Sequence, residues 1–262
     1  MQTGAITAYI DVAQLALYAF WIFFAGLVYY LHQENKREGY PLLPGRDLAG
    51  QARGSNEGFP PMPSPKRFLM PDGSVVLAPR QETPQVVNGV PASSFPGAPL
   101  VPLGDPLRAA MGPGAYAERA DVPDHTFDDG LPKVVPLRAA SAFFLTTEDP
   151  DLRGYTVIGC DGVTAGTVVE TWIDRSEVVI RYEEVQLTVG GASHTVLLPI
   201  NFASIDAKHR ILRVNAIRGA QFVYVPTLKN PDTVTLLEED KITAFYAGGL
   251  FYATPDRAES LL

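Results

Sequence analysis

The sequence predicts a single transmembrane helix joined to a mainly-β cytoplasmic domain that ends in a short helix. Three features of its 262 residues support this fold class. An uncharged apolar run covers residues 12–31, a proline-rich stretch follows, and runs rich in Val and Ile alternate with turn residues from about residue 136 onwards. Runs of the last kind are typical of a small antiparallel β-barrel or sandwich.

The apolar run, VAQLALYAFWIFFAGLVYYL, has the length of a membrane span. As a helix it would rise about 30 Å, which is the thickness of the hydrocarbon core of a bilayer. No Lys or Arg precedes Lys36 and the run ends in VYYLHQ, so a secretory signal is disfavoured. A buried helix of a soluble core is the weaker alternative. Tyr29 and Tyr30 stand where an interfacial aromatic belt is expected.

The charges beside this run predict its orientation. Asp11 is the charged residue on the N-terminal side, whereas Lys36 and Arg37 follow the other end. By the positive-inside rule, residues 1–11 lie in the periplasm and the chain after the helix lies in the cytoplasm. Lys36 and Arg37 also offer a modest site for anionic lipid headgroups, which the neighbouring glutamates weaken.

Composition argues against several classes of function. The net charge of −8 disfavours nucleic acid as a partner, because phosphate binding needs a clustered basic surface. Cys160 is the one cysteine, which excludes an internal disulfide framework and favours a reducing compartment. P-loop, GxGxxG, HExxH, GxSxG and EF-hand motifs are absent, and the histidines lack metal-ligand spacing. We therefore predict no catalytic, cofactor-binding or metal site.

Residues 32–135 form a proline-rich segment. Proline fixes φ and removes a backbone donor, so this stretch is predicted to be neither regular helix nor central sheet. We expect an extended layer that lies on another surface, with short strands at KRFLMP (66–71) and SVVLAP (74–79). Residues 43–58 have the composition of a disordered segment.

Residues 136–262 are predicted to form the β domain. The runs YTVIGC, TAGTVVETWID, EVVIRYEEVQLTV, HTVLLPINFASI and RILRVNAI partly alternate and are rich in β-branched residues. Turn signals separate them, which predicts five or six short strands. TLLEEDKITAFYAGG then predicts a helix with acidic residues in its first turn, ended by Gly248 or Gly249.

Two clusters of carboxylates are the candidates for chemistry. Asp174 and Glu177 stand in a predicted turn with Arg181 after them, and DVPDHTFDDG gathers further acids around a histidine. A solvated acidic loop explains either cluster. Carboxylates near a membrane interface can also accept protons from water and relay them inward, once burial raises a pKa. The charged residues of the second cluster are Asp121, Asp124, His125, Asp128 and Asp129.

Long stretches of the chain resemble one family. DVAQLALYAFWIFFAGLVYYL, ENKREGYPL, GDPLRAAMGPGAYAERAD, LPKVVPLRAA, VVETWIDRSE and VTLLEEDKITAFYAGGLFYATPDRAESLL resemble the H subunit of the photosynthetic reaction centre of purple bacteria. GCDGVTAGTVVETWIDR also resembles the PRC-barrel domain. The resemblance implies a single-pass protein of the bacterial inner (intracytoplasmic) membrane, with a PRC-type β-barrel on the cytoplasmic side.

The resemblance also implies a function. Such a chain is a non-catalytic subunit that caps the L and M subunits, which carry bacteriochlorophyll, bacteriopheophytin, quinones, non-haem iron and carotenoid. It binds none of these directly. Its implied roles are to stabilise the L/M core, to shield the quinone sites from water and to conduct protons to the secondary quinone Qb. A cytochrome subunit, the light-harvesting antenna and membrane lipids are further implied partners.

Individual roles follow only where residues match the family motif. Glu177 matches a family glutamate close to Qb, Arg181 matches its neighbouring arginine, and Asp174 belongs to the same motif. Some members carry paired histidines for proton uptake in the loop before KVVP, and this chain lacks that pair. Asp72 stands where some relatives have another histidine. The loop residues available for proton uptake here are Asp124, His125, Asp128 and Asp129.

Two other functions stay open on the sequence. One is a membrane-tethered adaptor that docks a soluble partner through the β-barrel. The other is a membrane-anchored enzyme with Asp174 and Glu177 as an acid–base pair. Purification without bacteriochlorophyll- and quinone-binding partners would favour the adaptor, and activity of residues 36–262 alone would favour the enzyme.

Overall fold

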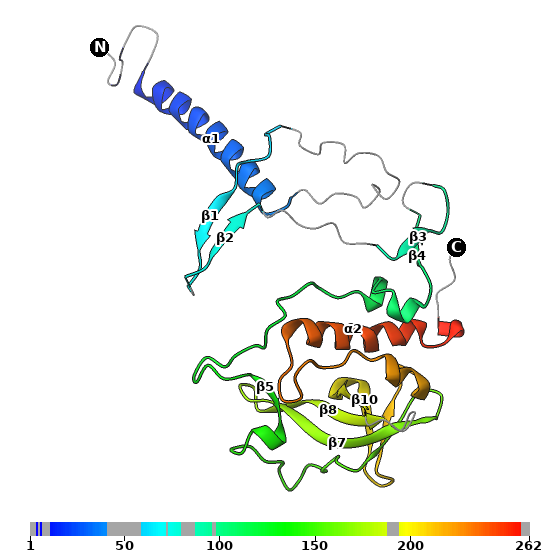
Figure 1. The fold of residues 1–262 in the computed structure, drawn as a ribbon. Helices are drawn as coiled ribbons and strands as arrows, with labels where there is room; N and C mark the ends of the chain where they lie inside the picture. The colour runs from blue at the N-terminus through cyan, green and yellow to red at the C-terminus, as the bar shows by residue number, and fades with distance from the viewer. Residues whose placement is uncertain are drawn as a thin grey trace. The chain divides into compact units, whose positions relative to one another are not determined.

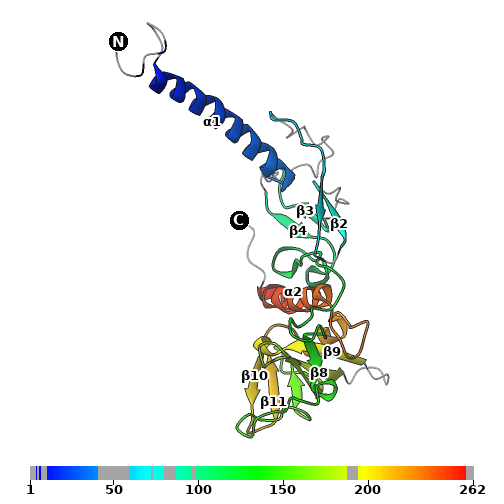
Figure 2. The ribbon, with the colours of Figure 1, turned by 90° about the vertical axis from the view of Figure 1, so that its left-hand side faces the viewer.

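The computed structural model describes residues 11–40, 59–71, 73–79, 87–95, 98–187 and 194–257, together with Gly4 and Ile6. The chain divides into two compact units, the helix unit (residues 1–85) and the barrel unit (residues 86–262). Figures 1 and 2 show the elements of both units. Residues 43–58, Asp72 and most of the predicted periplasmic segment lie outside the described residues.

The predicted membrane span forms one continuous helix, α1 (Val12–Arg37). Asp11 caps its start, because the carboxylate accepts a hydrogen bond of 2.7 Å from the backbone N–H of Gln14. The helix continues beyond the apolar run through polar residues of good helix propensity. It stops where Gly39 adopts a φ of 92°, in a turn whose backbone hydrogen bonds form a Schellman motif.

The apolar side chains of α1 are exposed. Among the described residues, α1 is the one helix that is long and apolar enough to cross a bilayer, and none of its most apolar window is buried. Trp21, for example, is 56% exposed. A helix that is apolar all round suits a hydrocarbon environment, as the anchor prediction requires.

A two-stranded hairpin, β1 (Lys66–Leu69) with β2 (Val75–Ala78), completes the described helix unit and confirms both predicted strands. Polar contacts fasten the open end of the hairpin to the last turn of α1. The Nζ of Lys66 lies 2.6 Å from the carboxylate of Glu34. The Nη1 of Arg37 donates to the carbonyl of Ala78 over 3.1 Å.

A curled sheet of seven strands forms the barrel unit, with the order β10-β11-β6-β7-β8-β9 and with β5 paired to β7 (Figure 1). Two irregularities in the pairing of β7 with β8 bend these strands, because a bulge increases local twist. The strands are β5 (Val134–Pro136), β6 (Thr156–Ile158), β7 (Thr164–Asp174), β8 (Val179–Leu187), β9 (His194–Pro199), β10 (Ala203–Asp206) and β11 (Ile211–Val214).

The observed sheet confirms the predicted mainly-β domain, and its neighbouring strands pair antiparallel with one exception. β6 and β11 pair in parallel, because the chain passes through the whole of β7 to β10 before it returns beside β6. The predicted run HTVLLPINFASI is divided into two strands, since Pro199 lacks a donor and a short 3₁₀ turn follows it. Val157, Trp172 and Leu212 are 0% exposed and mark the core.

The proline-rich segment contributes short elements, as its composition predicts. β3 (Gly89–Pro91) pairs with β4 (Leu100–Pro102), and two 3₁₀ turns then pack on the C-terminal helix. The 3₁₀ turns of the barrel unit are η2 (Pro106–Arg108), η3 (Gly112–Gly114), η4 (Leu137–Ala139), η5 (Ile200–Phe202), η6 (Gly219–Tyr224) and η7 (Pro255–Arg257).

The C-terminal helix α2 (Leu236–Tyr252) begins at a capping box formed by Thr235 with Glu238. The prediction that Gly248 or Gly249 ends this helix is wrong, because α2 continues past both glycines and ends at Tyr252. The glycines instead allow close packing. A Cβ on Gly248 would lie 3.0 Å from the Cα of Gly114, and one on Gly249 would lie 2.4 Å from a methyl group of Ile217.

Candidate functional site

Asp174 ends β7 and organises the turn into β8. Its Oδ1 accepts hydrogen bonds from the backbone N–H groups of Ser176, over 2.9 Å, and Glu177, over 3.0 Å. Its carbonyl accepts a third from Val178, over 2.9 Å. The carboxylate of Asp174 is buried while that of Glu177 is 57% exposed at the side chain. The turn predicted for these two residues is therefore observed.

Lys133 joins both carboxylates of this turn. Its Nζ lies 3.4 Å from Oδ2 of Asp174 and 3.5 Å from Oε1 of Glu177. That Oδ2 is buried and has no other hydrogen-bond donor among the described residues. Burial works to lower the pKa of Lys133, but attraction to the two carboxylates outweighs it and the pKa is raised. The ammonium group thus stays charged between an interior and an exposed carboxylate.

The acidic loop before β5 folds back and lies against the same turn. The backbone N–H of Lys133 donates to the carbonyl of Asp124 over 2.8 Å, which closes the loop. Arg175 then holds the loop to the turn. Its Nη2 lies 2.5 Å from Oδ2 of Asp129, and its Nη1 donates to the carbonyl of Pro132 over 3.2 Å. Two segments far apart in the sequence therefore form one polar cluster.

The four residues predicted for proton uptake in this loop are all exposed, and Asp129 among them has a strongly shifted pKa. The guanidinium of Arg175, with hydrogen bonds from Thr126 and Leu131, holds the pKa of Asp129 well below its usual range. Asp129 therefore stays ionised at neutral pH. The other three residues of this group are Asp124, His125 and Asp128.

Arg181 lies in a different cluster from Glu177. It lines a cavity of about 400 Å³ together with Glu239 of α2 and with Arg119, which precedes the acidic loop. The hydroxyl of Tyr182 donates to Oε1 of Glu239 over 2.8 Å. Burial raises the pKa of Glu239, while this hydrogen bond and the charges of both arginines limit the rise. No ion pair joins Arg181 to Glu177 within the described part of the chain.

The two tyrosines predicted at the membrane interface contact other parts of the helix unit. The ring of Tyr29 packs on that of Phe59, with 5.7 Å between the ring centroids. The Nζ of Lys66 lies 5.5 Å from the ring centroid of Tyr30. These contacts tie the end of α1 to the segment that follows it.

The basic pair after the membrane span also makes contacts inside the helix unit. Lys36 is 8% exposed, and its ammonium group donates to the carbonyl of Pro60. Arg37 donates to the carbonyls of Ser64 and Ala78. Binding of lipid headgroups by this pair stays a prediction.

A group of buried acids on β7 and β8 was not predicted from the sequence. Glu183 is 0% exposed and Glu170 is 7% exposed. Glu184 accepts hydrogen bonds of 2.9 Å from Arg138 and 3.1 Å from the indole N–H of Trp172. Neighbouring residues of a strand point to opposite faces, so the pair of glutamates in VIRYEEVQL signals that one carboxylate faces inward.

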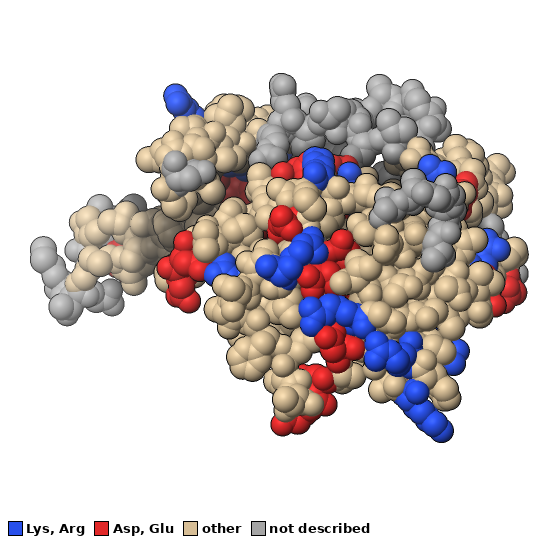
Figure 3. Space-filling model, turned by 60° about the horizontal axis from the view of Figure 1, so that its bottom comes forward, with Lys and Arg blue, Asp and Glu red and all other residues tan. Residues whose placement is uncertain are grey.

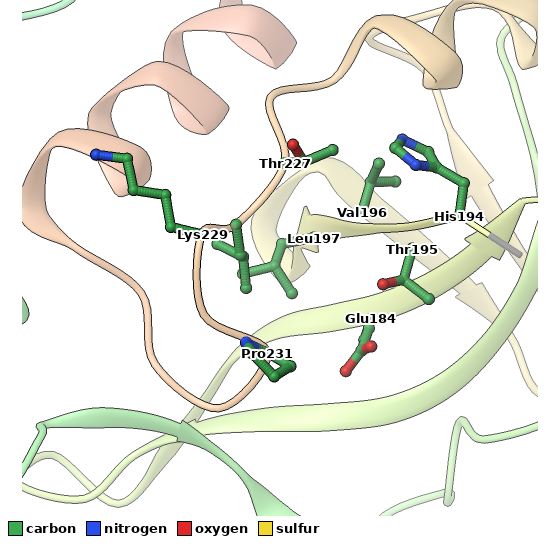
Figure 4. A pocket seen from close by; sticks show the side chains of 9 residues that line it. Glu184, His194, Thr195, Val196, Leu197, Thr227, Lys229 and Pro231 are labelled. Carbon is green, nitrogen blue, oxygen red and sulfur yellow. The ribbon is translucent and has the colours of Figure 1, made fainter.

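Other surface features of the barrel unit are less specific. A groove of about 330 Å³ runs beside the edge strand β9 and is lined by Glu184, His194 and Lys229, among others (Figure 4). Acidic and basic side chains lie side by side on the face shown in Figure 3. The described residues contain no group of three or more His, Cys, Asp or Glu that could hold a metal ion.

Two models of protein families match the chain. The model of the photosynthetic reaction centre H-chain N-terminal region matches residues 4–139, which is more than half of the 262 residues. The model of the PRC-barrel domain matches residues 147–221, which contain β6 to β11. Both agree with the resemblance seen in the sequence. The chain therefore belongs to the photosynthetic reaction-centre H-chain family, whose members are membrane-anchored, non-catalytic subunits of an electron-transfer complex with L and M partners that carry the cofactors.

Proposed function

We propose that this chain conducts protons from the cytoplasm towards the secondary quinone Qb of its partner subunits, while it stabilises the L/M core and shields the quinone sites. One observation carries the proposal. The acidic loop 124–129 and the turn 174–177 form a single polar cluster, joined by Lys133 and Arg175. The family match supports the setting of a reaction-centre subunit. The assignment of Glu177 to the position near Qb comes from the sequence resemblance alone.

A proton route needs titratable groups within hydrogen-bond reach of one another or of a shared water. Asp124, His125 and Asp128 are exposed, so they can exchange protons with the solvent. Across the cluster, side-chain exposure falls from 57% at Glu177 to 1% at Asp174. The turn thus offers one exposed and one buried carboxylate beside the exposed loop, and we assign uptake to the loop and delivery to the turn.

Asp129 is better suited to positioning than to proton transfer. Its low pKa keeps it ionised at neutral pH, so it does not pick up protons there. Its ion pair with Arg175 holds the acidic loop against the turn. Lys133, which follows the loop, is thereby kept between Asp174 and Glu177.

Glu239 is a further candidate for proton transfer. Burial raises its pKa above the ordinary value of a glutamate, which brings its protonation closer to neutral pH. The charge of Asp124 contributes to this rise, whereas that of Arg181 opposes it. We assign Arg181 the task of tuning Glu239 rather than Glu177, since it lines the same cavity as Glu239.

The substitution Glu177→Gln tests the proposal. It keeps the shape of the side chain but removes the group that accepts and donates protons. In assembled complexes we expect the proton-coupled second electron transfer to Qb to slow by about tenfold or more, with initial charge separation unchanged. Flash absorption spectroscopy measures both steps.

Glu148→Gln is the matched control, because Glu148 is an exposed glutamate of the same unit outside the polar cluster. Its second-transfer rate should equal that of the wild type. A wild-type rate in Glu177→Gln would refute the proposed route. Equal slowing in both variants would instead indicate a general effect of removing surface charge.

A further inference from the structure

Glu183 occupies a closed site on the face of β7 and β8. Its side chain is 0% exposed, and it pairs across the sheet with Thr171. The hydroxyl of Thr171 lies 2.9 Å from Oε2 of Glu183. The other oxygen, Oε1, is buried with no hydrogen-bond partner among the described residues. Burial of an ionised carboxylate in such a site costs much more free energy than burial of the neutral acid.

The charged groups around this site do not neutralise it. The charges of Glu170 of β7 and of Asp151 act on it as further acids, and Arg153 is the nearby cation. Arg153 is engaged elsewhere, because its Nη2 lies 2.7 Å from Asp151 and its Nη1 lies 3.8 Å from Glu170. Arg138 of η4 likewise pairs with Glu170, at 3.8 Å, and not with Glu183.

A segment here called the strap (Phe143–Arg153) lies beside this face of the sheet. Leu152 packs into the core, Arg153 pairs with Glu170, and the carbonyl of Arg153 accepts a hydrogen bond of 3.2 Å from Arg210. Thr171, Ile173 and Glu183 share the face, because alternate residues of a strand point the same way and Thr171 pairs with Glu183. A cavity of about 380 Å³ lies between strap residues such as Leu152 and sheet residues such as Ile173. Among the described residues these contacts include no strand pairing of the strap, so the strap can open locally while the sheet stays paired.

We propose that Glu183 is a buried proton-binding site that holds a proton at neutral pH while the strap is closed. Opening of the strap exposes the carboxyl group to water and releases this proton to the solvent. Alkaline pH therefore favours the open strap. The proposal does not rest on the proton route at the turn 174–177, which uses other residues.

The direction of the pH effect follows from proton linkage. Burial raises the pKa of Glu183 from its ordinary 4.5 to about 8; the hydrogen bond from Thr171 and the charge of Arg153 oppose this rise, and the charges of Asp151 and Glu170 add to it. Once the strap opens, the pKa returns towards 4.5. Between these values the closed state binds more protons than the open state. The stabilisation of the closed strap is thus complete below the lower value and lost as pH rises through the upper one.

Hydrogen exchange of the full-length chain in detergent micelles tests this, with protection corrected for the intrinsic pH dependence of exchange. In the wild type, protection of the strap should fall by up to about tenfold per pH unit until about pH 8 and then level off. In Glu183→Gln it should not change with pH over this range. Infrared spectroscopy at neutral pH should show a protonated carboxyl band in the wild type that the variant lacks.

Glu148→Gln serves as the control, because Glu148 belongs to the strap but is exposed. It should retain the wild-type pH profile and the infrared band. The same pH profile in Glu183→Gln as in the wild type would overturn the proposal. If that variant does not fold, the wild type alone decides the matter, since strap protection that is independent of pH is incompatible with the proposal.

Discussion

The helix unit and the barrel unit differ in where their apolar side chains lie. In the helix unit Ile22 is 75% exposed and Leu69 is 77% exposed, and the residue of α1 described as buried is the charged Lys36. In the barrel unit Trp172 and Leu212 are 0% exposed. The barrel unit therefore carries its own core. The exposed apolar side chains of the helix unit suit the apolar surroundings of a bilayer instead.

The two tryptophans offer the strongest test of this difference. We expect Trp172→Ala to lower the free energy of unfolding of the barrel unit by about 3–5 kcal/mol, because a large side chain leaves a cavity in a packed core. Trp21→Ala removes an exposed side chain and should change that free energy by less than about 0.5 kcal/mol. Urea unfolding of the full chain in detergent, followed by circular dichroism, measures both. Similar losses in the two variants would contradict the comparison.

Two glycines within helices give the next largest effect. Gly249→Ala should destabilise the barrel unit by about 1–3 kcal/mol, because the new Cβ would overlap the backbone of Ala216 and the side chain of Ile217. A Cβ at Gly26 of α1 meets nothing within 4 Å in the described structure, so Gly26→Ala should cost nothing in the same assay. A neutral Gly249→Ala would show that α2 can shift away from its neighbours.

The two helix caps give the smallest effect. Thr235 accepts a hydrogen bond of 3.1 Å from the N–H of Glu238 and donates one of 2.9 Å to Asp121, so Thr235→Ala should cost the barrel unit about 1 kcal/mol. Asp11→Ala removes the cap of α1 and should leave the barrel unit unchanged. Thermal unfolding of both variants compares them, and an equal shift of Tm would argue against independent units.

Local elements were predictable because their signals are local. The apolar run, the alternation of β-branched residues and the turn signals each span a few residues, and they predicted α1, the hairpin and the strands β6 to β11. The end of α2 was predicted wrongly for the opposite reason. Whether Gly249 ends a helix or lets it approach another segment depends on Ile217, which no pattern near the glycine reveals.

The candidate site divides in the same way. The turn containing Asp174 and Glu177 was predictable, since its hydrogen bonds join residues within one turn. The contact of this turn with the acidic loop through Lys133 was not predictable. Arg181 and Glu177 are close in sequence, yet they lie in different clusters. Closeness in sequence is a weak guide on a strand, because neighbouring side chains point to opposite faces.

The sequence by itself determined the anchor, the hairpin, the runs that form β6 to β11, the presence of α2, the turn after β7 and the resemblance to a family. Only the tertiary structure decided which charged groups meet, as Arg175 meets Asp129, and which are buried, as Glu183 is. The physical reason is that periodicity and turn formation act over a few residues along the chain. Ion pairing and desolvation act over a few ångströms in space, between residues that only the fold brings together.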